Sequence, residues 1–192
     1  MQRGLIRLLT LAAAAIVIAP ATARADGYVS PWVAANTNSS FNSGRGGFGV
    51  GAGDMGASIF GGEVDFGWSP SFLGTTDKFG NNSVIDLMGN VMVARSLGNS
   101  YRTDIRPYVT AGMGLLRTQV DGGTIAQVSS SKNDPGWNVG AGVMGFFSDH
   151  VGIRGDVRYL RTFTNENSVT PAPDFDPGGF HFWRTYVGVV IR

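Results

Sequence analysis

The sequence predicts an all-β fold: an eight-stranded antiparallel up-and-down transmembrane β-barrel. Three observations lead to this fold class. Eight segments alternate apolar with polar residues, the connections between them are alternately short and long, and the charged side chains gather on one strand face that contains no lysine. A charge-free face against lipid and a polar face toward the interior are typical of a barrel in the outer membrane of a Gram-negative bacterium.

The N-terminal segment has the features of a secretory signal peptide. Two arginines precede an apolar run over residues 8–19, and a small-x-small cleavage site, Ala23-Arg24-Ala25, follows it. The run is shorter than the roughly 20 apolar residues that a membrane helix needs. We therefore expect a cleaved signal peptide over residues 1–25 and one mature barrel domain over residues 26–192.

Each predicted strand carries apolar residues at every second position, which places them on one face of an extended chain. In the strand that begins at residue 151, VGIRGDVRYL, the charges Arg154, Asp156 and Arg158 share one face and leave the other face apolar. The segment over 84–96 repeats the pattern, with Asp86 on the polar face. In chain order, the predicted strands span about residues 27–35, 46–53, 57–68, 84–96, 103–117, 137–147, 151–163 and 180–191.

The connections differ in length in a regular way. Short connections follow the second, fourth and sixth strands, and long polar ones follow the first, third, fifth and seventh. The long connections span about residues 37–45, 69–82, 118–135 and 164–179. Short periplasmic turns at one end and long extracellular loops at the other are the layout of outer-membrane barrels.

The polar strand face carries equal numbers of acids and arginines. A balanced set suits an enclosed space, where each forked guanidinium must find a carboxylate. We therefore predict a charge network inside the barrel, in the lumen, that consists of Glu63, Asp65, Asp86, Arg106, Arg154, Asp156, Arg158 and Arg184.

Lysine and aromatic residues are also distributed as in a membrane barrel. The two lysines, Lys78 and Lys132, both fall in predicted long loops, although lysine is a usual residue of solvent-exposed strands. Aromatic residues cluster near the strand ends, as expected for side chains at the two membrane interfaces. The predicted aromatic girdle consists of Trp32, Phe66, Trp68, Trp137, Phe147, Tyr159 and Trp183.

Composition argues against several other classes of protein. Without the three arginines of the signal, 12 basic residues remain of the 15 in the full chain, against 14 acidic residues, a net charge of −2 that predicts no nucleic-acid partner. The chain has no cysteine, which removes thiol chemistry and cysteine-held metals. Two G-x-G-x-x-G matches, at 51–56 and 140–145, lack the helix that a dinucleotide site requires. We expect no cofactor and no metal.

Four segments carry a family resemblance: FGGEVDFGWSPSF (residues 60–72), IRPYVTAGMGLLRT (105–118), WNVGAGVMGFFSDHVGIRGDVRYLRTF (137–163) and FWRTYVGVVIR (182–192). In them the sequence resembles the small outer-membrane β-barrel proteins related to OmpA and OmpX, often called porin-family proteins. The resemblance implies outer-membrane lipid, lipopolysaccharide and the barrel-assembly machinery as partners. The chain departs from that family at its last residues, Ile191-Arg192, where such barrels usually end on an aromatic residue.

For function, these features favour a structural or surface-interaction protein, in which a plugged barrel displays four loops that could bind a surface ligand. Two alternatives stay open. One is a narrow pore or porin-like channel for small solutes, although eight strands leave an interior that side chains fill. The other is an outer-membrane lipid-modifying enzyme, but the two histidines, His150 and His181, have no evident nucleophile or orienting acid, so we expect no catalytic residue.

Overall fold

The computed structural model describes residues 27–38, 45–55, 59–72, 81–97, 104–121, 130–163 and 180–192. The predicted signal peptide over residues 1–25 lies outside these ranges, as do most residues of the predicted long loops. The described part of the chain includes no helix that is long and apolar enough to cross a membrane.

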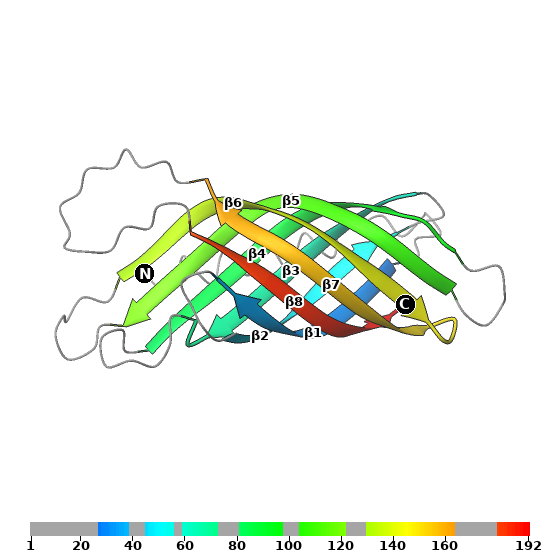
Figure 1. Ribbon diagram of the computed structural model, residues 1–192, viewed down its shortest axis with the longest axis horizontal. Helices are drawn as coiled ribbons and strands as arrows, with labels where there is room; N and C mark the ends of the chain where they lie inside the picture. The colour runs from blue at the N-terminus through cyan, green and yellow to red at the C-terminus, as the bar shows by residue number, and fades with distance from the viewer. Residues whose placement is uncertain are drawn as a thin grey trace.

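Eight strands form a closed barrel in which each strand is antiparallel to its neighbours in the chain (Figure 1). The barrel closes where β1 pairs with β8, with Asn36 opposite Arg184. The predicted eight-stranded up-and-down barrel is therefore confirmed. The strands are β1 (Gly27–Thr37), β2 (Arg45–Asp54), β3 (Phe60–Pro70), β4 (Asn81–Ala94), β5 (Asp104–Asp121), β6 (Ser130–Phe146), β7 (Val151–Thr162) and β8 (His181–Ile191).

Four of the seven connections between strands lie at one end of the barrel, and three lie at the other. The connections β1–β2, β3–β4, β5–β6 and β7–β8 lie at one end, which we call the loop end. The other three connections lie at the opposite end, the turn end, together with Gly27 and the C-terminal Arg192. In Figure 1 the turn end is on the right, where the yellow turn between β6 and β7 lies near the C-terminus.

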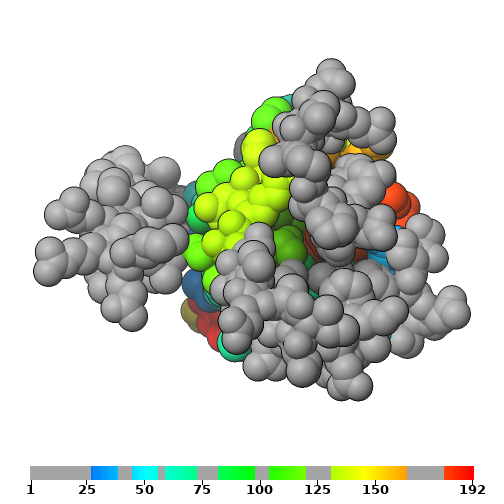
Figure 2. All heavy atoms as spheres, turned by 90° about the vertical axis from the view of Figure 1, so that its left-hand side faces the viewer, coloured from blue at the N-terminus to red at the C-terminus, as the bar shows by residue number. Residues whose placement is uncertain are grey.

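The hairpin of β5 and β6 extends further than the sequence predicted. The two strands pair as far as Val120 opposite Ser130, and in the view onto the loop end they form most of the coloured surface (Figure 2). Lys132, predicted to lie in a loop, is therefore a residue of β6, where its Nζ lies 3.1 Å from Asp134 Oδ1. The expectation that lysine avoids the strands was wrong here, because β6 begins before Trp137 in the chain. Its first residues, including Lys132, extend past the edge of the apolar outer band, where Trp137 lies.

The strand faces are inverted relative to those of a soluble protein. In β7, Ile153 is 61% exposed, whereas its neighbour Arg154 is 1% exposed. The same alternation continues through the strand, with Val157 outside and Asp156 and Arg158 inside. Aliphatic side chains therefore form the outer wall, and the charges face the lumen.

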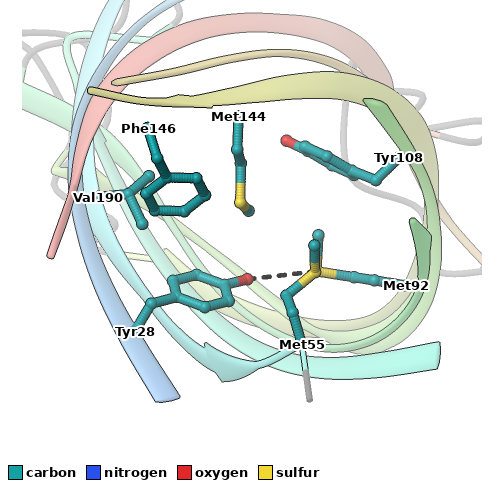
Figure 3. Packing of buried hydrophobic residues seen from close by; sticks show 7 residues of the cluster. All are labelled: Tyr28, Met55, Met92, Tyr108, Met144, Phe146 and Val190. Atoms are coloured by element: carbon teal, nitrogen blue, oxygen red, sulfur yellow. Dashed lines mark hydrogen bonds between the residues drawn. The ribbon is translucent and has the colours of Figure 1, made fainter. Parts of the chain in front are cut away.

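The lumen is closed at the turn end by a cluster of apolar and aromatic side chains. They converge from several strands, and the Tyr28 hydroxyl oxygen lies 3.2 Å from the sulfur of Met92 (Figure 3). We call this group the turn-end cluster: Tyr28, Met55, Met92, Tyr108, Met144, Phe146 and Val190.

A second apolar group closes the lumen at the loop end. Phe72 contacts Phe182 with ring centroids 4.9 Å apart, and both side chains are buried. This loop-end cluster consists of Phe72, Val84, Met88, Leu116, Leu160 and Phe182. The interior thus has three layers, with the charged residues between two apolar seals.

Large interior side chains fit because glycines face them. A Cβ added at Gly142 would lie 2.3 Å from the Tyr108 hydroxyl oxygen and 2.5 Å from the Gly155 carbonyl oxygen, whereas a Cβ at Gly155 would meet nothing within 4 Å. The two glycines therefore have different roles, although they lie on adjacent strands.

We predict that Gly142→Ala lowers the urea midpoint of unfolding in detergent micelles and that Gly155→Ala leaves it nearly unchanged. Overpacking a tightly filled interior costs about 1–3 kcal/mol, whereas a methyl group on the open outer face does not. Equal midpoints for the two variants would contradict the close approach of Tyr108 to the β6 backbone.

Candidate functional site

The middle layer of the lumen holds seven of the eight residues predicted for the charge network. All seven are buried, and they come from two opposite sides of the barrel: β3 and β4 supply the acids Glu63, Asp65 and Asp86, and β7 and β8 supply the rest. Because β3 and β7, like β4 and β8, lie four strands apart in a closed ring of eight, their ion pairs cross the full width of the lumen. The residues from the second side are Arg154, Asp156, Arg158 and Arg184.

Glu63 is held by two arginines from the facing wall. Arg154 donates to both carboxylate oxygens, and Arg158 Nη2 donates to Oε1 at 2.7 Å. The Tyr28 hydroxyl donates to Oε2 at 2.7 Å. The carboxylate therefore receives four hydrogen bonds, which is the kind of saturation that a buried charge needs.

Asp156 lies between the same two arginines on β7. Arg158 Nε donates to its Oδ1 at 3.1 Å, and Arg154 Nη2 donates to its Oδ2 at 3.3 Å. The hydroxyls of Tyr108 and Tyr186 also donate to Oδ2, and the bond from Tyr186 is 3.0 Å long. The two arginines thus join two carboxylates into one network.

A second ion pair links β8 with β4 nearer the loop end. Arg184 binds Asp86 with both terminal nitrogens, at 2.9 and 2.5 Å, which is the bidentate geometry that arginine and carboxylate favour. Its Nε donates to Asn36 Oδ1 at 3.0 Å, and Asn36 Nδ2 donates to the Ser69 hydroxyl at 2.9 Å. All the polar groups named here are buried.

Trp32 was wrongly predicted to belong to the aromatic girdle. Its side chain is 3% exposed and points into the lumen, where its Nε1 donates to Asp65 Oδ2 at 3.0 Å and the Arg184 guanidinium lies over its ring. Trp32 shares the inward face of β1 with Ser30 and Asn36, so strict alternation would have placed it correctly. Gly49 on β2 leaves the space that the indole occupies.

Arg106 was predicted to join the charge network, and the structure places it elsewhere. Its Nε lies 2.5 Å from Asp104 Oδ2 at the turn end, and its guanidinium lies over the Phe146 ring. Tyr108, the next inward residue of β5, belongs to the turn-end cluster, which separates Arg106 from the buried acids. The middle layer therefore contains four acids and three arginines.

Three tyrosines also belong to the network, and none of them was predicted to join it. The guanidinium of Arg154 lies 4.9 Å from the ring centre of Tyr108 and 5.3 Å from that of Tyr186. These two tyrosines therefore contact the cation with their rings, while their hydroxyls donate to Asp156. Tyr28 adds its hydroxyl to Glu63. Their inward position within the strand alternation was the available signal.

The other predicted girdle residues lie on the outer wall. Trp137, Tyr159 and Trp183 form a row across β6, β7 and β8 at the loop end, with ring centroids 5.7 and 5.2 Å apart. Trp68 contacts Phe48 at 5.1 Å on another side of the barrel. The remaining two residues, Phe66 and Phe147, are also exposed, Phe147 in the turn after β6.

The two histidines lie at opposite ends of the barrel. His150 is in the turn between β6 and β7, and His181 is the first residue of β8, with its ring 5.9 Å from that of Tyr159. Within the described ranges no three His, Asp or Glu side chains are grouped so that they could hold a metal ion. The functional chemistry that the geometry supports is charge pairing that fixes the two walls of the barrel to each other.

The sequence matches the family described as Outer membrane protein beta-barrel domain over residues 9–183. No curated protein matches the sequence significantly.

Several solved structures share the fold at low sequence identity. Neisserial surface protein A, from Neisseria, is 16% identical with a TM-score of 0.60, over 86% of this chain and 96% of that one. A major outer membrane protein from Thermus thermophilus is 13% identical with a TM-score of 0.52, over 86% and 98% of the two chains. The N-terminal β-barrel domain of Pseudomonas aeruginosa OprF is 12% identical with a TM-score of 0.50, over 85% and 96%.

We predict that Arg154→Ala lowers the free energy of unfolding in detergent by about 3–5 kcal/mol, because it leaves Glu63 and Asp156 buried with fewer partners. The matched control is Arg161→Ala on the same strand, where the side chain is exposed and the described residues offer no ion pair. That change should alter stability by less than about 0.5 kcal/mol. Urea titration of both variants measures the difference, and equal losses would place Arg154 in contact with water.

Proposed function

Because the chain belongs to the Outer membrane protein beta-barrel domain family, we propose that it is a structural outer-membrane protein whose plugged barrel anchors four long loops at the cell surface. The cross-lumen ion pairs are the observation that carries this proposal. Arg154 and Arg158 connect β7 to Glu63 on β3, and Arg184 connects β8 to Asp86 on β4. A barrel braced in this way is a rigid support for loops that vary in sequence.

The filled interior argues against a solute channel as the main function. Eight strands enclose a space just wide enough for side chains, whereas water-filled porins have about sixteen strands or more. Here the charged layer lies between the turn-end and loop-end clusters, whose Met92 and Phe182 are fully buried. Conduction would require both seals and the ion pairs between them to move.

The loop end is the part of the molecule that we assign to recognition. The four connections at this end are longer on average than the three at the turn end, and outer-membrane barrels place long loops outside the cell and short turns in the periplasm. We propose three kinds of partner: a surface ligand that the loops bind, the lipopolysaccharide and lipid that surround the barrel, and the assembly machinery that inserts the barrel into the membrane. The net charge of −2 after signal removal, from 12 basic and 14 acidic residues, gives no basis for nucleic-acid binding.

We propose no enzymatic role. Acyl transfer or hydrolysis needs a nucleophile, a base and an orienting acid on one surface. His150 and His181 lie at opposite ends of the barrel, and the carboxylates of the middle layer are occupied by arginine, tyrosine and tryptophan donors.

We predict that the purified protein in planar lipid bilayers shows no steady conductance. The seals and the paired charges leave side chains where a water column would have to pass. Phe182→Ala, which thins the loop-end seal while the ion pairs stay in place, should remain silent as well. Stable, ohmic channels of porin size in the wild-type protein would contradict the proposed anchoring role and would favour a role in solute transport.

The orientation of the barrel can be tested with single cysteines, because the natural chain has none. We expect a membrane-impermeant maleimide to label Ser168→Cys, in the β7–β8 connection, on intact cells. Ser148→Cys, in the turn between β6 and β7, should be labelled only after the outer membrane is opened. Labelling of Ser148→Cys alone on intact cells would reverse the orientation.

A further inference from the structure

An apolar groove lies on the outer wall near the turn end, over β4, β5 and β6. Its volume is about 520 Å³, within the range of pockets that hold small molecules. The lining is almost entirely aliphatic and includes Ile59, Val93, Pro107, Val109 and Ala141.

The strand register explains why the wall is hollow here. Val93, Val109 and Ala141 lie side by side in one row across the three strands. The row nearer the turn end contains Pro107, whose carbonyl accepts a hydrogen bond of 3.1 Å from the Arg95 amide. The small Ala141 and the compact ring of Pro107 leave space between the exposed side chains of Ile59 and Val109.

Arg95 lies at the turn-end rim of this groove and is exposed. No carboxylate of the described residues forms an ion pair with it, in contrast to Arg106 and Arg192, which both lie near Asp104. The sequence of the adjoining connection, residues 98–103, contains no acidic residue. An unpaired guanidinium at the edge of a lipid-facing apolar surface is a binding partner for an anionic headgroup.

We propose that this groove binds one phospholipid of the inner leaflet, with its phosphate on the Arg95 guanidinium and one acyl chain along Val93, Val109 and Ala141. Arginine matches phosphate in charge and in its forked donor geometry, and the aliphatic lining matches the chain. The assignment to the inner leaflet rests on the proposed function, which places the turn end in the periplasm.

Native mass spectrometry of the full-length mature barrel tests this site directly. The protein, released from a mild detergent after addition of dimyristoyl phosphatidylglycerol, should retain one lipid. Arg95→Gln should lower the retained fraction about fivefold, the effect expected for one basic residue at a membrane surface. Ala141→Trp, which fills the groove without changing charge, should lower it as well.

Two matched variants control for charge and bulk elsewhere on the outer wall. Arg161→Gln removes an exposed arginine at the loop end, and Ala35→Trp adds an indole on the exposed face of β1. Both should retain lipid as the wild type does, and heat-modifiable migration in gels should show that all four variants are folded.

Equal lipid retention by Arg95→Gln and the wild type would overturn the site, as would an equal loss in the two control variants. Lipopolysaccharide offered in place of the phospholipid should bind without dependence on Arg95, and the opposite preference would reject the assigned lipid class. These measurements use purified protein, so they are independent of the cysteine labelling that tests orientation.

Discussion

The pairing of buried arginines with carboxylates across the lumen is the constraint on which the rest of the structure depends. The interior is too narrow for bulk water, so each charge that faces it needs a protein partner. Arg154 and Arg158 meet this need by each contacting both Glu63 and Asp156. Without these ion pairs, the two walls would be connected only through the backbone hydrogen bonds of the strands between them. The ion pairs therefore hold the cross-section of the barrel constant.

The glycine content follows from the same constraint. Bulky inward side chains require neighbouring positions without a Cβ: Gly49 faces the Trp32 indole, and Gly67 lies beside the carboxylate of Asp86. An added Cβ at Gly67 would lie 2.5 Å from an Asp86 oxygen and 2.8 Å from Arg184 Nη1. The 29 glycines of the chain therefore include positions that make room for the network, beyond any role in strand curvature.

Strand alternation predicts whether a side chain points into or out of the barrel. This was sufficient to predict the barrel fold and the inward position of its charged residues. It does not report how far along the barrel axis a residue lies or what it meets across the lumen. Arg106 has the inward direction that the sequence implies, but its depth puts it beside Asp104 at the turn end. Trp32 shows the reverse error, since its large aromatic ring suggested a membrane interface although its alternation pointed inward. Partners such as Tyr186 depend on how the closed sheet brings distant strands together, which no local pattern encodes.

Charged side chains have different roles on the inner and outer surfaces of the barrel wall. Those inside stabilise the fold, and those outside are available to bind a ligand. Inside, Arg184 is fully enclosed and bound to Asp86, so it contributes to the fold and has little capacity left for a ligand. Outside, the aliphatic band is free of charge until its rims, where Arg95 and Arg161 are exposed. A guanidinium at such a rim can extend to a headgroup while its aliphatic stem stays in the apolar layer. The chemistry available for binding therefore lies at the rims and in the loops, and the lumen is the part of the molecule that keeps them in place.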